Sequence, residues 1–168
     1  MIIVECYAEV VLIETLGFND IRHEENKAAV IEELKKRAGS HVRVVGLVDE
    51  DPSSPWPSYW RRFRQIKASG HGFSVWAGPG GNVYAILLHP RHEEWIYDVA
   101  RRYGFNVRNY HLPQSRERFW SLLHSGRRTR RRVLSCYRKL LEDMLRKGCP
   151  ALTGLKAELR SLLKNVSA

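Results

Sequence analysis

The sequence predicts an α/β fold in which a parallel sheet is flanked by helices and is followed by an all-helical C-terminal extension. Three observations predict this class. Apolar segments of strand length alternate with amphipathic helical segments over the first 50 residues, a pattern typical of βαβ units. Two more apolar segments of strand length lie between residues 73 and 88. After Tyr110 only helical patterns remain.

The first 50 residues supply three predicted strands and two predicted helices. The strands are expected at residues 2–4, 18–23 and 42–48, and the last of these is the most β-branched stretch of the chain. The helices are expected at residues 8–17 and 27–37. Gly17 and Gly39 stand where helices commonly end. This alternation places the carboxyl ends of the strands at one edge of the sheet.

The remaining elements are less uniform. A proline-rich loop at residues 51–57 precedes a short basic helix, expected at 58–67. Strands are expected at 73–77 and 83–88, and the tight turn between them makes them either a hairpin or the two flanks of a turn at a sheet edge. Further helices are expected at 93–103, 115–124, 128–147 and 152–165. We therefore predict an α/β domain at 1–110 and a basic helical extension, 111–168, that packs on it.

Charge is distributed unevenly along the chain. Residues 1–100 hold 11 Lys and Arg against 14 Asp and Glu, whereas residues 101–168 hold 17 against 4, and the net charge is +10. A basic half can neutralise phosphates while clustered acids hold a cation, which is what a protein that processes a polyanion needs. The alternatives are a basic surface that only aids solubility or one that binds an acidic protein.

Composition also limits the class of protein. No apolar run approaches the roughly 20 residues of a membrane span, and the N-terminal residues are unlike a signal peptide. We therefore expect a soluble, cytoplasmic protein that does not bind a membrane. Cys6, Cys136 and Cys149 are too few and too widely spaced for a disulfide framework or a paired metal site.

Four carboxylates follow predicted strands. Glu5 ends the first strand, Glu9 lies in the first turn of the next helix, and Asp49 and Asp51 follow the third strand. Ligands of open α/β sheets bind at the carboxyl ends of strands, and oxygen ligands suit a hard cation. We predict a Mg²⁺ or Mn²⁺ site. Each pair of acids taken alone also has a simpler explanation. Glu9 can be a partner of the helix dipole, and two aspartates at a strand end can belong to an ordinary turn.

At these residues the sequence resembles the Toprim domain, found in topoisomerases, primases, ribosomal-RNA maturases and nucleases of the overcoming-lysogenisation-defect (OLD) family. The resemblance rests on Ile3-Val4-Glu5 with Glu9 and on Val48-Asp49-Glu50-Asp51, and it covers roughly residues 1–100. Cys6 replaces the usual glycine, so that a β-carbon would narrow the site. Pro90-Arg91-His92-Glu93-Glu94-Trp95 loosely resembles a further acidic segment of small stand-alone OLD-like proteins. The ATPase signature GxxxxGK[ST] is absent.

The resemblance implies a Toprim-like, Rossmann-like sheet and a set of roles. Glu5 would be a general acid/base or a metal ligand, Asp49 and Asp51 would bind Mg²⁺, and Glu9 would assist. His23 and Lys27 resemble a segment between the two motifs, and Lys27 would contact the scissile phosphate. The residues alone leave other roles open: solvation of a helix start for Lys27, a structural role for His23 and a helix-start acid for Glu93.

The densest charge of the chain is an arginine run at the start of a predicted helix. Positive charge at that end is unfavourable for the helix dipole, and a bound phosphate would compensate for it. Arginine binds phosphate through two parallel hydrogen bonds. A solvated face or a protein partner is the alternative explanation of the run. The nucleic-acid contacts that we predict are Arg127, Arg128, Arg130, Arg131 and Arg132.

Together these features predict a metal-dependent nuclease that hydrolyses phosphodiesters of DNA or RNA, with largely sequence-independent, salt-sensitive binding. Two other functions stay open. The chain would be a non-catalytic Toprim-like nucleic-acid-binding subunit of a larger complex, or a basic adaptor whose acids only cap helices and turns. A protein partner or a homodimer is compatible with each of them.

Overall fold

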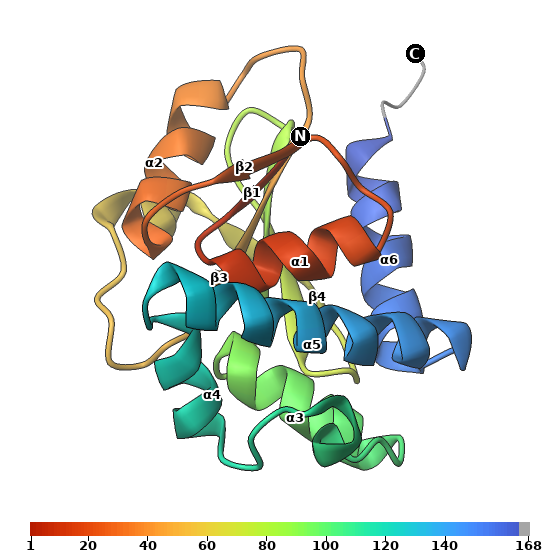
Figure 1. Cartoon of the computed structure of the whole chain (residues 1–168). Helices are drawn as coiled ribbons and strands as arrows, with labels where there is room; N and C mark the ends of the chain where they lie inside the picture. The colour runs from red at the N-terminus through yellow and green to blue at the C-terminus, as the bar shows by residue number, and fades with distance from the viewer. Residues whose placement is uncertain (165–168) are drawn as a thin grey trace.

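The computed structural model describes residues 1–164 and has an α/β fold with a six-stranded sheet. Figure 1 shows the sheet flanked by helices. The strands are β1 (Ile2–Val4), β2 (Ile21–His23), β3 (Val44–Asp49), β4 (Arg64–Ala68), β5 (Phe73–Ala77) and β6 (Val83–Leu88). The helices are α1 (Tyr7–Thr15), α2 (Lys27–Arg37), α3 (His92–Arg102), α4 (Arg116–Leu123), α5 (Arg127–Arg146) and α6 (Pro150–Leu163), with 3-10 helices at Ser58–Arg62 and Val107–Tyr110.

The sheet is mixed, not wholly parallel as the sequence predicts. Its strand order is β2-β1-β3-β6-β5-β4, and the first four strands are parallel. Strands β5 and β4 run antiparallel at one edge. The reason is the short connection at residues 78–82, which is long enough for a hairpin but far too short for the crossover that a parallel pair requires.

A helix predicted at residues 58–67 forms over its first half only. The chain makes a 3-10 turn at Ser58–Arg62, becomes extended at Phe63 and continues as β4. Phe63 is buried and stacks on Trp60, which fixes the chain against the sheet. The edge of β5 then offers unpaired backbone groups, and pairing with it overrides the helical propensity of the Arg, Gln and Lys residues of β4.

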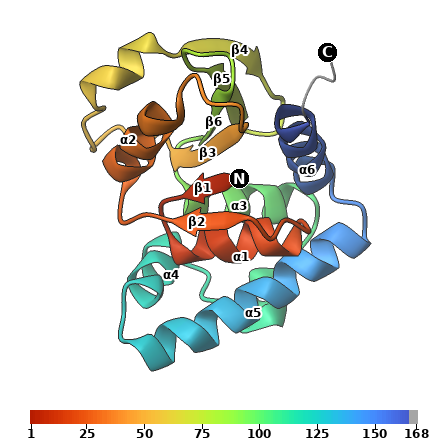
Figure 2. The same cartoon turned by 90° about the horizontal axis from the view of Figure 1, so that it is seen from above.

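Alternate residues of the strands serve two separate cores. Ile2, Val4 and Leu47 face the larger core, which is shared with α1, α3, α4, α5 and α6. Ile3 and Val48 face the smaller core, which is shared with α2. Figure 2 shows this division, with α2 on one side of the sheet and α1 and α5 on the other. Because side chains alternate along β3, Asp49 points to the α1 side.

The helices after Tyr110 pack on that same side. Helix α5 lies along α1 in both views (Figures 1 and 2). Its buried stripe consists of Val133, Tyr137, Leu140, Leu141 and Met144. The predicted final helix reaches residue 165, which lies outside the described residues. Within residues 1–164, no helix combines the length and the apolar character needed to cross a membrane.

Candidate metal centre

Three carboxylates meet where β1 and β3 end. The two strands are parallel neighbours, so Glu5 after β1 and Asp49 at the end of β3 arrive at one edge of the sheet. Glu9 lies in the first turn of α1, directly after β1. One oxygen of each of these three side chains lies within 4.8 Å of the others. The sequence predicted that these three residues and Asp51 would meet here, because Glu5, Asp49 and Asp51 follow strand ends and Glu9 lies in the first turn of the next helix.

Glu9 is the most deeply placed of the three. Its Oε2 atom accepts hydrogen bonds from the backbone N–H groups of Glu5 (2.8 Å) and Cys6 (3.1 Å). The bond from Cys6, the N-cap residue, belongs to a capping box at the start of α1. The side chain is fully buried, and no group in residues 1–164 donates to its Oε1 atom. A buried oxygen without a partner is costly unless a ligand completes it.

Glu5 and Asp49 are held in the same way. Glu5 Oε1 accepts the backbone N–H of Asp49 at 2.7 Å, and Asp49 Oδ1 accepts the backbone N–H of His92 at 2.8 Å. His92 is the first residue of α3, whose dipole favours negative charge at that end. Each carboxylate is therefore oriented through one oxygen, and the other oxygen has no hydrogen bond within the described chain. This donor set fits a hard divalent cation.

Burial raises the pKa of all three carboxyl groups. It raises the pKa of Glu5 to about 7, and it raises the pKa values of Glu9 and Asp49 well above their usual range. Repulsion within the cluster acts in the same direction, as Glu5 does on Glu9 and on Asp49. A cation would relieve both costs, so that its binding would release protons near neutral pH.

We expect the metal-free protein to lose stability as the pH rises from 6.5 to 8.5. A carboxyl group whose pKa is raised by folding holds its proton more tightly in the folded chain, so its contribution is present at low pH and is lost as pH rises through the folded pKa. For Glu5 that pKa is about 7. Glu5 alone accounts for a loss of about 1 kcal/mol over this window, and Glu9 and Asp49 add to it because their pKa values are also raised well above the usual range. Denaturant unfolding in EDTA measures it.

The window begins at pH 6.5 because of His92. Burial lowers the pKa of His92 to about 3, so this group adds stability as pH rises toward its unfolded pKa of about 6.5 and nothing above it. Added Mn²⁺ should reverse the loss at pH 8.5. A free energy of unfolding in EDTA that stays constant or rises across this window would contradict the raised carboxyl pKa values.

The acids at 49–51 separate, each to a different partner. Asp51 has a φ of 32° and leaves the strand, and its Oδ1 accepts hydrogen bonds from Arg91 (2.8 and 3.0 Å) and Ser53. These partners lower the pKa of Asp51. Glu50 contacts His89 Nδ1 at 2.8 Å. The sequence predicts Glu5, Asp49 and Asp51 as metal ligands. In the structure Glu5 and Asp49 lie together with Glu9, whereas Asp51 pairs with Arg91.

Lys27 supports the loop after β3. Its Nζ donates to the backbone carbonyls of Glu50, Asp51 and Ser54 at 2.9, 3.4 and 3.4 Å, and it lies 4.0 Å from the ring centre of Trp56. The side chain is buried, and burial lowers its pKa. These contacts fix the segment that positions Asp49. A contact of Lys27 with a phosphate stays a prediction.

Ser74, His89 and Glu50 have the hydrogen-bond order of a hydrolase triad. Ser74 Oγ lies 2.8 Å from His89 Nε2, and His89 Nδ1 contacts Glu50. Ser74 is only 3% exposed, however, and its Oγ also accepts the indole N–H of Trp76 at 2.9 Å. A nucleophile must reach its substrate. The arrangement therefore ties β5 and β6 to the segment after β3.

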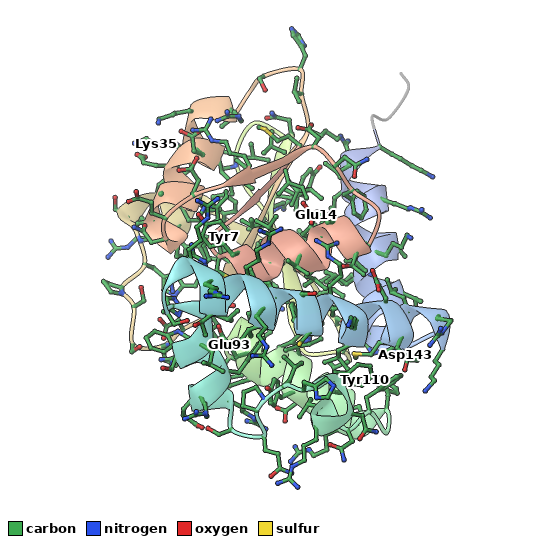
Figure 3. The ribbon with its side chains drawn as sticks, in the orientation of Figure 1. Tyr7, Glu14, Lys35, Glu93, Tyr110 and Asp143 are labelled. Atoms are coloured by element: carbon green, nitrogen blue, oxygen red, sulfur yellow. The ribbon has the colours of Figure 1, made fainter. Side chains whose placement is uncertain are left out.

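A cavity of about 240 Å³ opens beside the carboxylates. Tyr7 and Glu93, labelled in Figure 3, come from α1 and α3 and both line it. Glu93 is buried, which raises its pKa. His23 stacks on Tyr7 with 4.3 Å between ring centres, and the Arg130 guanidinium lies 4.5 Å from the Tyr7 ring. The other lining residues are Glu5, Cys6, Ala8, Glu25, Leu123 and His124.

Cys6 fits its place without strain. Its backbone is extended, with a φ of −141°, so a glycine is not required there. Its N–H is one of the two donors to Glu9. Burial raises the pKa of the thiol, which keeps it protonated at neutral pH. The departure from the Toprim pattern at this position therefore changes the lining of the cavity but not the path of the chain.

The arginine run divides between two sides of α5. Arg127, Arg130 and Arg131 line a hollow with Val11 on the α1 side. Arg128 and Arg132 line another hollow, with His111 and Leu122. A helix advances about 100° per residue, so five arginines within six positions cannot share one face. Of the five, Arg130 alone lines the cavity beside the carboxylates as well.

Two groups at the start of α3 hold the aspartates in place, and the sequence did not predict this role for them. The backbone N–H of His92 holds Asp49, and the Arg91 side chain holds Asp51. Both follow β6, which is the parallel neighbour of β3. The rule that ligand-binding groups follow the carboxyl ends of adjacent parallel strands would have found them, had β6 been placed next to β3.

Comparison with protein-family models, with curated proteins and with solved structures finds no match to this chain. The resemblance to Toprim domains therefore depends on the residues around Glu5 and Asp49 alone. A function for this chain has to be inferred from the geometry where β1 and β3 end.

Proposed function

We propose that this protein is a Mg²⁺- or Mn²⁺-dependent nuclease of the Toprim type, which hydrolyses phosphodiester bonds of nucleic acid. The observation that carries the proposal is the convergence of Glu5, Glu9 and Asp49 at one sheet edge, with a fully buried Glu9 oxygen that has no partner in residues 1–164. Carboxylates brought together at this cost are best explained by a cation that they hold.

Each residue has a role in this proposal. Glu9 and Asp49 would hold the cation, which would supply positive charge to polarise a phosphodiester. Glu5, with a pKa of about 7, can hold or release a proton at neutral pH and is the general acid/base or a third ligand. Glu93 is a second buried carboxyl on the same cavity. Arg130 at this cavity would neutralise phosphate charge.

The finer architecture belongs to the same proposal. The parallel strands β2, β1, β3 and β6 would be the core of a Toprim-like domain, and α4, α5 and α6 would be its basic helical extension, which would clamp the substrate. A soluble, cytoplasmic protein suits a nucleic-acid substrate. The resemblance of the two motifs supports this assignment.

The second candidate is a non-catalytic nucleic-acid-binding subunit of a larger complex. Lys27, which the resemblance places at the scissile phosphate, donates to three loop carbonyls instead. The edge strand β4 is exposed along its whole length and presents Ile66, which is 48% exposed. An open strand edge is a common site for a protein partner.

A cleavage assay separates the two candidates. End-labelled single-stranded and double-stranded DNA and RNA are incubated with the protein in Mg²⁺, in Mn²⁺ and in EDTA. We expect shortened products with either cation and none in EDTA. Binding without cleavage in every condition would reject the nuclease and favour the subunit, and cleavage in EDTA would reject the metal centre.

A further inference from the structure

The α1-facing side of α5 presents a line of arginines without carboxylate partners. Arg127, Arg130 and Arg131 make no ion pair within residues 1–164, whereas Arg138, further along the same side, pairs with Glu14. All three also lie within the first five residues of α5, where the helix dipole disfavours positive charge. Arg128 and Arg132 make no ion pair within residues 1–164 either, but the α1-facing three line one hollow together and can contact a single anionic ligand.

Arg130 connects this line to the carboxylate cavity. It lines both the hollow of about 410 Å³ on the α1 side and the cavity of about 240 Å³ beside Glu5. It is half-buried, and its guanidinium is held over the Tyr7 ring at 4.5 Å. The two hollows therefore share a wall, and an extended anion could lie along α5 with one end at the carboxylates.

Two exposed aromatic pairs flank the cavity. Tyr7 is 45% exposed and stacks on His23. Trp120 is 49% exposed and lies over His124, which also lines the cavity, with 4.2 Å between ring centres. Exposed rings beside a cationic groove are typical of sites for single-stranded nucleic acid, because unpaired bases can stack on them. The bases of a duplex are already stacked on each other.

We propose that the site takes a single strand of nucleic acid, whose sugar-phosphate backbone runs from the carboxylate cavity over Arg130 and along Arg127 and Arg131. The bases lie against the pairs Tyr7–His23 and Trp120–His124. Arg128 and Arg132, on the other side of α5, take no part. This inference rests on the proposed function for the identity of the carboxylate site, but it concerns binding, which is measured without cleavage.

The chain offers a matched pair of variants. Arg127→Gln/Arg131→Gln and Arg128→Gln/Arg132→Gln each remove two positive charges from the same turns of the same helix. Binding of fluorescent strands of about 20 nucleotides, DNA and RNA, is measured by anisotropy in EDTA at several salt concentrations. The first variant should bind on the order of tenfold more weakly, with a salt slope smaller by about 1.4, and the second should stay within about twofold.

A blunt duplex of the same length tests the choice of a single strand. Wild-type protein should prefer the single strand, and Trp120→Ala or Tyr7→Ala should weaken its binding while leaving duplex binding unchanged. Thermal unfolding of each variant checks that the fold is intact. Equal weakening by the two arginine variants, equal or tighter binding of the duplex, or no binding of nucleic acid would overturn the inference. Strand binding as expected, without cleavage in Mg²⁺ or Mn²⁺, would overturn the nuclease and leave this inference standing.

Discussion

Replacing Glu9 with glutamine is expected to abolish metal-dependent cleavage and, at the same time, to stabilise the metal-free protein at pH 8. The two effects have one origin. Burial raises the pKa of Glu9 well above its usual range. At pH 8 the folded wild-type chain must therefore either keep a charged carboxylate buried or take up a proton that the unfolded chain does not bind. Each alternative lowers the free energy of unfolding, and a neutral glutamine amide avoids both.

Glutamine can also keep the local structure. Its amide oxygen can accept the backbone N–H groups of Glu5 and Cys6, which now bind Glu9 Oε2. Its NH₂ group would face the carboxylates of Glu5 and Asp49, which can accept from it. The capping box survives, and the cation loses a negatively charged ligand. We expect a gain of about 1 kcal/mol in EDTA and a loss of at least about 100-fold in cleavage.

Glu14→Gln is the matched control, since it makes the same chemical change on the same helix. Glu14 lies in the last turn of α1, its side chain is 42% exposed, and it pairs with Arg138. Its removal should change the free energy of unfolding by less than about 0.5 kcal/mol and leave the response to Mn²⁺ intact. Urea unfolding at pH 8, in EDTA and in Mn²⁺, measures both variants. If the metal-free Glu9→Gln protein were less stable than the wild type, burial of the Glu9 carboxyl group would not be costly, and the prediction would be wrong.

The parallel half of the fold follows from local patterns. The segments that become β1, β3 and β6 are short and apolar, β1 and β3 are also rich in β-branched residues, and α2 begins and ends where its N-cap and the following glycine predict. Because β1 and β3 are parallel neighbours, Glu5 and Asp49 arrive at one edge of the sheet, and Glu9 lies in the helix that follows β1. The convergence of Glu5, Glu9 and Asp49 could therefore be predicted before any side chain was placed.

What the sequence could not show depends on contacts between distant residues. Strand β4 forms because β5 offers an edge, which its own residues do not encode. Asp51 matches a ligand by spacing, but a left-handed backbone and Arg91, 40 positions away, redirect it. The arginine run looks uniform as a string of letters, and only the position of α1 beside α5 separates Arg130 from Arg128.

Asp49→Asn and Asp51→Asn are expected to differ by at least about 100-fold in cleavage, although the two aspartates are two positions apart. Asp49 belongs to the carboxylate group, and its Oδ1 is held by the His92 N–H. An asparagine there would keep that hydrogen bond and lose the charge that a cation needs. Calorimetric titration with Mn²⁺ should detect no binding to this variant, and its cleavage should fall to the level of the EDTA control.

Asp51→Asn should have a smaller and different effect. The substitution removes the ion pair between Asp51 and Arg91 and loosens the loop at residues 51–54. Because the pair is partly exposed, the free energy of unfolding should fall by about 1 kcal/mol. The Asp51 charge raises the pKa values of Glu5 and Asp49, which shows that its field reaches the cluster. Without this negative charge the variant should attract Mn²⁺ less, and we expect it to bind the cation only a few-fold more weakly. If Asp51→Asn abolished Mn²⁺ binding as fully as Asp49→Asn, Asp51 would have to leave Arg91 to ligate the cation, and the Arg91 contact would then be the part of this site that changes when metal binds.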